Sequence, residues 1–314
     1  MKKNYPLLSF RFFLMAVFSV SVSVSSFAQK NNHIAGRFTT LKNTKVRLAG
    51  HSTSGSILIS EGAVDSSGHF SLKYPRDYTG MAEVGTAEGT FGILLHSEDF
   101  EISGTEVRDP ASFQFKNSPE NEALYQGIRI RQEVDKKLEG LQHLKALYKN
   151  KRLGMVNREI YVQEKKLGEF SKKLPKESYS AYYLNLYNLV GNLKAQTVSD
   201  AGRLGDLERL FNSLDFADPR LATSGLFAEI LDSYFKLLEG NYDAADRQQH
   251  FTASIGFVLK SLEAVPDLQK STAAYLFHFA ANPVAAGQTD SMVMRLLPNS
   301  DYPAKKESTS FAKP

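Results

Sequence analysis

The first part of the chain alternates apolar and polar residues over short segments. Eight such segments occupy residues 33–41, 44–51, 54–62, 69–74, 81–87, 91–97, 99–104 and 112–116. They are rich in β-branched and aromatic residues, and turn-forming Gly, Asn, Asp or Ser separates them, as is typical of strands. Strands at this spacing predict an antiparallel β-sandwich over residues 29–116.

The pattern changes at Pro119, where apolar residues begin to recur every three or four positions. Ser118 is placed to cap a helix here, and Pro119 suits its first position. The apolar stripe of this long helix consists of Leu124, Gly127, Ile130, Val134, Leu138, Leu141, Leu144 and Tyr148. Because the connection from the last strand is short and the sheet edges need covering, we expect the helix to start against the sandwich.

Further helices follow the same periodicity. They are predicted to start near Val156, after Pro175, near Leu204, after Pro219, near Arg247, after Pro266 and near Gln288. One of them carries a stripe that we interpret as core, made of Tyr179, Tyr183, Leu186, Val190 and Leu193. The predicted fold is therefore β + α, with the sandwich followed by an all-α helical domain over 117–297 of about seven or eight helices. A polar tail over 298–314 is expected to be disordered.

The segment DSSGH, residues 65–69, contains side chains that could bind a metal or form a hairpin turn. Asp65 favours an Asx-type turn, and Gly68 supplies the positive φ of a tight hairpin. A calcium loop needs several oxygen ligands at alternate positions, and Asp65 is the one charged oxygen donor here. We predict a hairpin turn, with Phe70 and Leu72 on one face and His69 and Ser71 on the other.

The N-terminus has the features of a signal peptide over residues 1–28. Basic Lys2, Lys3 and Arg11 precede an apolar stretch, and small residues lead to a cleavage site between Ala28 and Gln29. Serines interrupt the apolar stretch, which argues against the alternative of a membrane anchor. We expect cleavage after Ala28 and a periplasmic or secreted protein without a transmembrane segment.

Charge and cysteine content narrow the class of function. The net charge of +4 falls to +1 when the three basic residues of the signal peptide are removed, so nothing predicts nucleic-acid binding. The chain contains no cysteine, which excludes a thiol nucleophile, a Cys-x-x-Cys redox centre and disulfides.

No catalytic, cofactor-binding or metal-binding residues are predicted. The histidines lack metal-ligand spacing, although convergence of His51, His69 and His96 in the sandwich stays open. Ser233 and Lys236 match Ser-x-x-Lys, but a mid-helix position is expected and no Lys-Thr-Gly follows. The glycines of GTAEGTFG lack a following helix or Lys, so they form no phosphate loop. The pair Asp215 and Asp218 is better explained by a helix cap at Asp218.

Several segments together resemble a known arrangement. These are IAGRF, KVRLAG, AVDSSGHFSL, GILLHSEDFEIS, FKNSPENEALYQ and LERLFNSLDFADPRLATSGLFAEILDSYF, in an order that runs from about Ile34 to beyond Ala281. They resemble the N-terminal β domain and helical region of envelope thioredoxin-like thiol-disulfide oxidoreductases of Gram-negative bacteria, the alkyl hydroperoxide reductase/thiol-specific antioxidant family. In that family a thioredoxin domain with a Trp-Cys-x-x-Cys centre follows the helices, whereas this chain has neither Cys nor Trp.

No catalytic residue is carried over from the resemblance, and we expect no disulfide reductase or peroxidase activity, because that chemistry needs a thiolate. The first hypothesis is a non-catalytic periplasmic binding or scaffolding protein whose two domains form a recognition surface. The alternative is the accessory half of a split or truncated thiol-disulfide oxidoreductase, whose partner is a separately encoded thioredoxin-like or other envelope protein. A hydrolase with unidentified residues is the weakest hypothesis.

Overall fold

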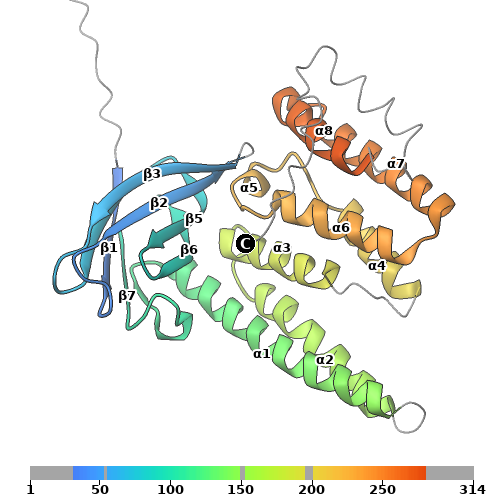
Figure 1. Ribbon diagram of the computed structural model, residues 1–314, viewed down its shortest axis with the longest axis horizontal. Coiled ribbons are helices and arrows are strands. Elements are labelled where there is room, and N and C mark those ends of the chain that lie inside the picture. The colour runs from blue at the N-terminus through green and yellow to red at the C-terminus, as the bar shows by residue number, and fades with distance from the viewer. Residues whose placement is uncertain (1–30, 53–54, 149–152, 195–200, 281–314) are drawn as a thin grey trace, which may run out of the picture.

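The computed structural model describes residues 31–52, 55–148, 153–194 and 201–280. In this part of the chain, eight strands precede eight α-helices, which confirms the predicted β + α fold (Figure 1). The signal peptide with its Ala28–Gln29 cleavage site, the helix expected near Gln288 and the tail over 298–314 lie outside the described residues.

Each strand falls on one of the segments with alternating apolar residues. The strands are β1 (Asn31–Phe38), β2 (Lys45–Ser52), β3 (Gly55–Ala63), β4 (His69–Pro75), β5 (Thr79–Thr86), β6 (Gly89–His96), β7 (Phe100–Gly104) and β8 (Gln114–Lys116). In β1, for example, Ile34 and Phe38 are fully buried and the residues between them alternate in exposure. This alternation is what one face buried against a core produces.

The strands form two sheets that enclose one hydrophobic core. Their orders are β4-β1-β7-β8 and β3-β2-β5-β6. Phe38 lies at the centre of the core, with ring centroids 5.3 Å from Phe91 of the other sheet and 5.1 Å from Phe113. Among the described strands, all pairs are antiparallel except β1 and β7, which run parallel.

The turn at residues 65–69 has the predicted local structure but a different place in the topology. The Asp65 carboxylate accepts hydrogen bonds from the N–H groups of His69 (2.9 Å) and Ser67 (2.7 Å), and Gly68 has a φ of 84°. The bond from His69 is the main cause that holds the pKa of Asp65 below its ordinary value. However, β3 pairs with β2 and β4 pairs with β1, so the turn carries the chain from one sheet to the other. The prediction of a hairpin is wrong for this reason.

The helices are α1 (Pro119–Leu147), α2 (Leu153–Ser171), α3 (Tyr179–Leu193), α4 (Ala201–Asn212), α5 (Pro219–Ala222), α6 (Phe227–Asn241), α7 (Ala244–Ser261) and α8 (Pro266–Ala280). Helices α1 and α2 form a long hairpin beneath α3, and the later helices stack above it (Figure 1). A second core lies among α3, α4, α6, α7 and α8, where Phe211 and Tyr234 stack at 3.6 Å between centroids. No described helix has the length and apolar character needed to cross a membrane.

The apolar stripe of α1 is buried only near the sandwich. Leu124 and Val134 are buried, whereas Leu144 and Tyr148 are exposed. At the far end of the α1–α2 hairpin, Leu147 and Met155 are exposed as well. The apolar stripe of α1 therefore extends beyond the part of the helix that is buried against other described residues.

The single helix expected after Pro219 is two helices. Asp218 caps α5 as predicted, since its carboxylate accepts the N–H of Arg220 at 2.8 Å. Helix α5 ends after one turn at Ala222, Gly225 adopts a φ of 73° in the connecting segment, and α6 starts at Phe227. The prediction missed this break.

The junction between the halves is held by a polar network. Ser118 occupies the N-cap position of α1, but its hydroxyl donates to the Glu98 carboxylate (2.5 Å) and makes no capping bond, so its predicted capping role is wrong. The Asn121 amide donates to the same hydroxyl at 2.9 Å. Ser118 thus ties the start of α1 to the loop before β7.

Helix α1 also covers the edge of the sheet at β6. The Asn121 side chain accepts the N–H of Leu94 (2.8 Å) and donates to its C=O (2.7 Å), as a neighbouring strand would. One turn later, the Tyr125 hydroxyl donates to the C=O of Gly92 at 2.7 Å. The expectation that the helix starts against the sandwich is confirmed by these contacts.

A second attachment lies on β5 at Met81, which pairs with Leu94 in the ladder. The Met81 N–H donates to the C=O of Thr223, just after α5, at 2.9 Å. The Tyr179 hydroxyl donates to the C=O of Arg220 at 3.0 Å, which links α3 to the same segment. Two separate sets of backbone-directed hydrogen bonds therefore fix the helical half against the sandwich.

Candidate functional site

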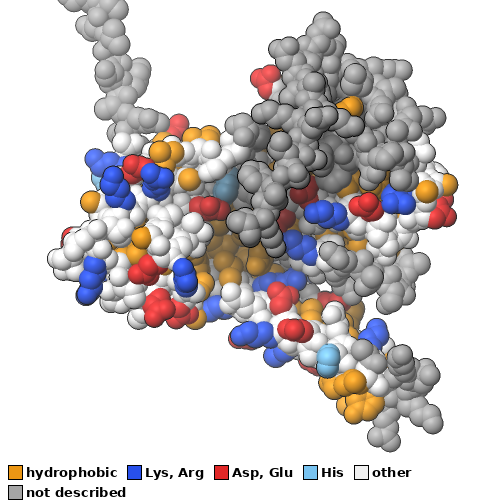
Figure 2. Space-filling view, viewed as in Figure 1, with side chains coloured by type: hydrophobic (Ala, Val, Ile, Leu, Met, Phe, Trp, Pro, Cys, Tyr) orange, Lys and Arg blue, Asp and Glu red, His pale blue; other side chains and the backbone are white. Residues whose placement is uncertain are grey.

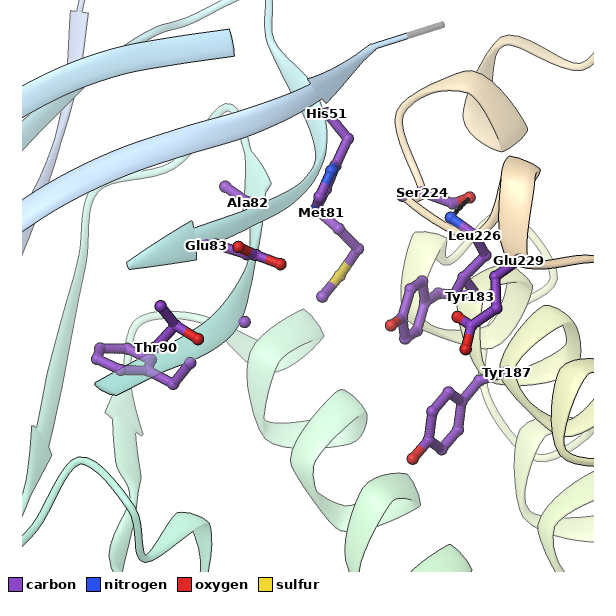
Figure 3. A pocket seen from close by; sticks show the side chains of 13 residues that line it. His51, Met81, Ala82, Glu83, Thr90, Tyr183, Tyr187, Ser224, Leu226 and Glu229 are labelled. Carbon is purple, nitrogen blue, oxygen red and sulfur yellow. Dashed lines mark hydrogen bonds between the residues drawn. The ribbon is translucent and has the colours of Figure 1, made fainter. Parts of the chain in front are cut away.

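A cleft of about 310 Å³ lies between the two halves, where the outer face of β5 and β6 meets α3 and α6 (Figure 3). We call it the interdomain cleft. Hydrophobic side chains are visible in the hollow between the sandwich and the helices (Figure 2). Both halves contribute to the lining, which includes Met81, Glu83 and Thr90 from the sandwich and Tyr183, Tyr187 and Glu229 from the helices. The cleft therefore depends on the docking of the two halves.

The strand alternation of β5 builds the sheet wall of the cleft. It turns Ala82 and Val84 into the sandwich core and Met81 and Glu83 toward the helices. Glu83 is exposed and pairs across the ladder with Gly92 of β6. Because Gly92 has no side chain, the space beside the Glu83 carboxylate stays open.

Helix α3 supplies an aromatic wall opposite. Tyr183 and Tyr187 lie one helical turn apart, and their rings stack with centroids 6.1 Å apart and planes 12° from parallel. Their hydroxyls point toward the sandwich (Figure 3). Beside them, Glu229 in the first turn of α6 forms an ion pair with Lys194, the residue that ends α3.

The end of the cleft is closed by His51 and the segment between α5 and α6. A Cβ at Gly225 would lie 2.8 Å from the His51 ring, and Gly225 also has positive φ. Glycine is thus required there both for its backbone conformation and for the approach of the imidazole. The same segment places Ser224 and Leu226 in the lining.

The surroundings of Tyr183 disfavour the ionised form of its hydroxyl. Burial is the main cause that raises the pKa of the Tyr183 hydroxyl, and the neighbouring Tyr187, Glu229 and Glu83 raise it further. Tyr183 therefore stays protonated at neutral pH. Within the described residues its hydroxyl has no hydrogen-bond partner, so it is available to a ligand.

The cleft offers carboxylate acceptors, phenol hydroxyls and an apolar floor around Met81. The described part of the chain contains no group of three or more His, Cys, Asp or Glu residues that could hold a metal ion. The groups lining the cleft are those of a recognition site for a small polar or charged group.

The histidines of the sandwich do not converge. His51 lines the interdomain cleft, whereas His69 lines a separate hollow on the outer face of the β4-β1-β7-β8 sheet. His96 is exposed at the end of β6. His69 approaches the Asp65 carboxylate at 3.5 Å, within the turn that both residues form.

The other sequence candidates take structural positions. Ser233 is buried within α6 and Lys236 is exposed, as a mid-helix position implies. The glycine-rich segment over residues 85–92 spans the turn between paired strands β5 and β6. Asp215 accepts the N–H of Ala217 at 3.0 Å in the turn before the Asp218 cap.

Sequence reasoning missed Glu83, Tyr183 and Glu229 as site residues. Four members of the aromatic stripe on α3 are buried as predicted, but Tyr183 is half-buried and faces the cleft. Glu83 could not be singled out from the sequence, because polar residues are common on the outer face of a strand. The one available signal was Tyr183 itself, a polar-tipped residue within an apolar stripe.

No family model, curated protein or solved structure matches this chain.

Proposed function

We propose that this chain is an exported, non-catalytic binding or scaffolding protein that recognises its ligand in the interdomain cleft. The observation that carries the proposal is that both halves build the cleft and are locked together around it by Asn121, Tyr125 and Thr223. Ligand sites occur preferentially at domain interfaces, and the volume falls at the lower end of the usual range of about 300–1,000 Å³.

The non-catalytic role is supported by the hydrogen bonding of Ser224, the serine that accompanies His51 among the described lining residues. Ser224 and His51 both belong to the lining, but the Ser224 hydroxyl is buried and engaged in local structure. It donates to the C=O of Leu221 at 2.7 Å and accepts the N–H of Leu226 at 3.0 Å. A hydroxyl held this way shapes the α5–α6 turn and is poorly placed to act as a nucleophile.

Export is proposed on the basis of residues 1–28 and of the resemblance to envelope oxidoreductases. Mass spectrometry of the protein from the envelope fraction should find Gln29 at the N-terminus. Retention of Met1 together with membrane association would show that the segment is an anchor.

Filling the cleft should abolish ligand binding. Thr90 is exposed on β6 and lines the cleft, so Thr90→Trp introduces an indole into the cavity without disturbing the core. Native mass spectrometry of protein incubated with envelope extract should show an adduct on the wild-type chain that Thr90→Trp lacks.

The matched control is Ser71→Trp, at an exposed strand position of the other sheet and outside the cleft. This variant should keep the adduct. An adduct that persists in Thr90→Trp, or no adduct on the wild-type chain, would refute the cleft as the binding site.

A further inference from the structure

We propose that the ligand of the interdomain cleft presents a positively charged organic group, an ammonium or a guanidinium. The inference rests on the proposed function, because it names the chemistry that the same cleft selects. It comes from three independent features of the lining: the uncompensated carboxylate on the sheet wall, the tyrosine faces on the helix wall, and the apolar side chain between them.

The sheet wall carries a carboxylate without a counterion. Among the described residues no Lys, Arg or His forms an ion pair with Glu83, which is exposed on the face of β5 that lines the cleft. Across the cleft, Lys194 forms an ion pair with Glu229. A ligand cation would supply the missing charge for Glu83 and would form a charge-assisted hydrogen bond.

The helix wall suits the same group. Tyr183 and Tyr187 present stacked rings, and a cation is attracted to the face or the hydroxyl oxygen of such a ring. A cation–π contact of this kind occurs elsewhere in the molecule. The Arg220 guanidinium of α5 lies 4.2 Å from the ring centroid of Tyr182, which belongs to α3 like Tyr183 and Tyr187. The Glu83 carboxylate, which lacks an ion-pair partner among the described residues, would repel an anion and attract a cation.

The apolar part of the lining fits the stem of such a ligand. Met81 lies between the Glu83 carboxylate and the tyrosines (Figure 3) and is buried. A thioether adapts its shape to a flexible methylene chain. The cleft is thus suited to an alkyl chain that ends in a cation, either as a free amine or guanidine or as a Lys or Arg side chain.

The test measures binding of matched probes to the mature chain by amide chemical shifts. Butylamine, 1-butanol and butyrate each contain four carbon atoms and differ in the charge of the end group, and agmatine adds a guanidinium. Butylamine and agmatine should shift the resonances of Glu83 and Tyr183, whereas butanol and butyrate should not. A blocked Gly-Arg-Gly peptide distinguishes the source, because tighter binding than agmatine would indicate a protein partner and weaker binding a free small molecule.

Glu83→Gln should weaken agmatine binding about tenfold, the loss expected for one charge-assisted hydrogen bond. Glu106→Gln removes the same charge at an exposed position outside the cleft and should leave the affinity unchanged. Equal binding of butyrate and butylamine, or an unchanged affinity in Glu83→Gln, would overturn the ligand class. If the cations fail while Thr90→Trp still removes the native adduct, the cleft function stands and only the class is wrong.

Discussion

Replacing Gly68 with alanine is expected to lower the free energy of unfolding by about 3 kcal/mol. Gly68 has a φ of 84°, where a side chain is strained, and an added Cβ would lie 2.0 Å from the backbone oxygen of Phe38. The C=O of Gly68 also accepts the N–H of Phe38 at 3.1 Å, so the backbone has little room to move away. Denaturation in guanidinium chloride measures the loss directly.

The control is an alanine at a glycine that has none of these constraints. Gly140 is exposed in the interior of α1, and nothing lies within 4 Å of a Cβ built on it. Gly140→Ala should stabilise the protein by about 0.5–1 kcal/mol, because alanine loses less backbone entropy in a helix. Similar effects of the two substitutions would contradict the role assigned to the turn at residues 65–69.

Asn121→Ala is expected to cost about 3 kcal/mol, because it leaves two buried backbone groups without partners. Asn121 is fully buried, and its amide satisfies both the N–H and the C=O of Leu94 on the edge strand β6. The loss should appear in chemical denaturation, and amide exchange at Leu94 should accelerate because its hydrogen bond to the helix is gone.

Asn212→Ala serves as the comparison for this substitution. Asn212 is exposed in the last turn of α4, where a change should stay within about 0.5 kcal/mol. If Asn121→Ala were no more destabilising than Asn212→Ala, the side chain would not be what holds the helix against the sheet edge.

The strands could be located from the sequence because burial of one face imposes alternation on strands such as β1, β2 and β4. Strand pairing could not, because it depends on contacts between distant segments. The turn at Asp65 and Gly68 shows the difference, since its local hydrogen bonds follow from residue type while β3 and β4 join separate sheets. Similarly, the cap at Asp218 is local, but the break before α6 depends on how Gly225 fits beneath His51.

The candidate site could not be predicted from local sequence patterns, for the same reason. Glu83 and Tyr183 are separated by a hundred positions and by the whole α1–α2 hairpin, and each follows the ordinary periodicity of its own element. They meet because α1 attaches to β6 at Gly92 and Leu94 while the segment after α5 attaches to β5 at Met81, the partner of Leu94 in the ladder. The sequence spacing of Glu83 and Tyr183 therefore does not predict that they line the same cleft.

The side-chain pairing of Asn121 with β6 also bears on how such a chain can change in evolution. A sandwich inherited without α1 would present the backbone of Gly92 and Leu94 as an open edge, a template on which strands of other chains assemble. A gene fusion or truncation at the junction between the last strand and α1 would therefore expose this sheet edge. A sandwich reused without α1 would need another element, or protective residues, at the edge of β6.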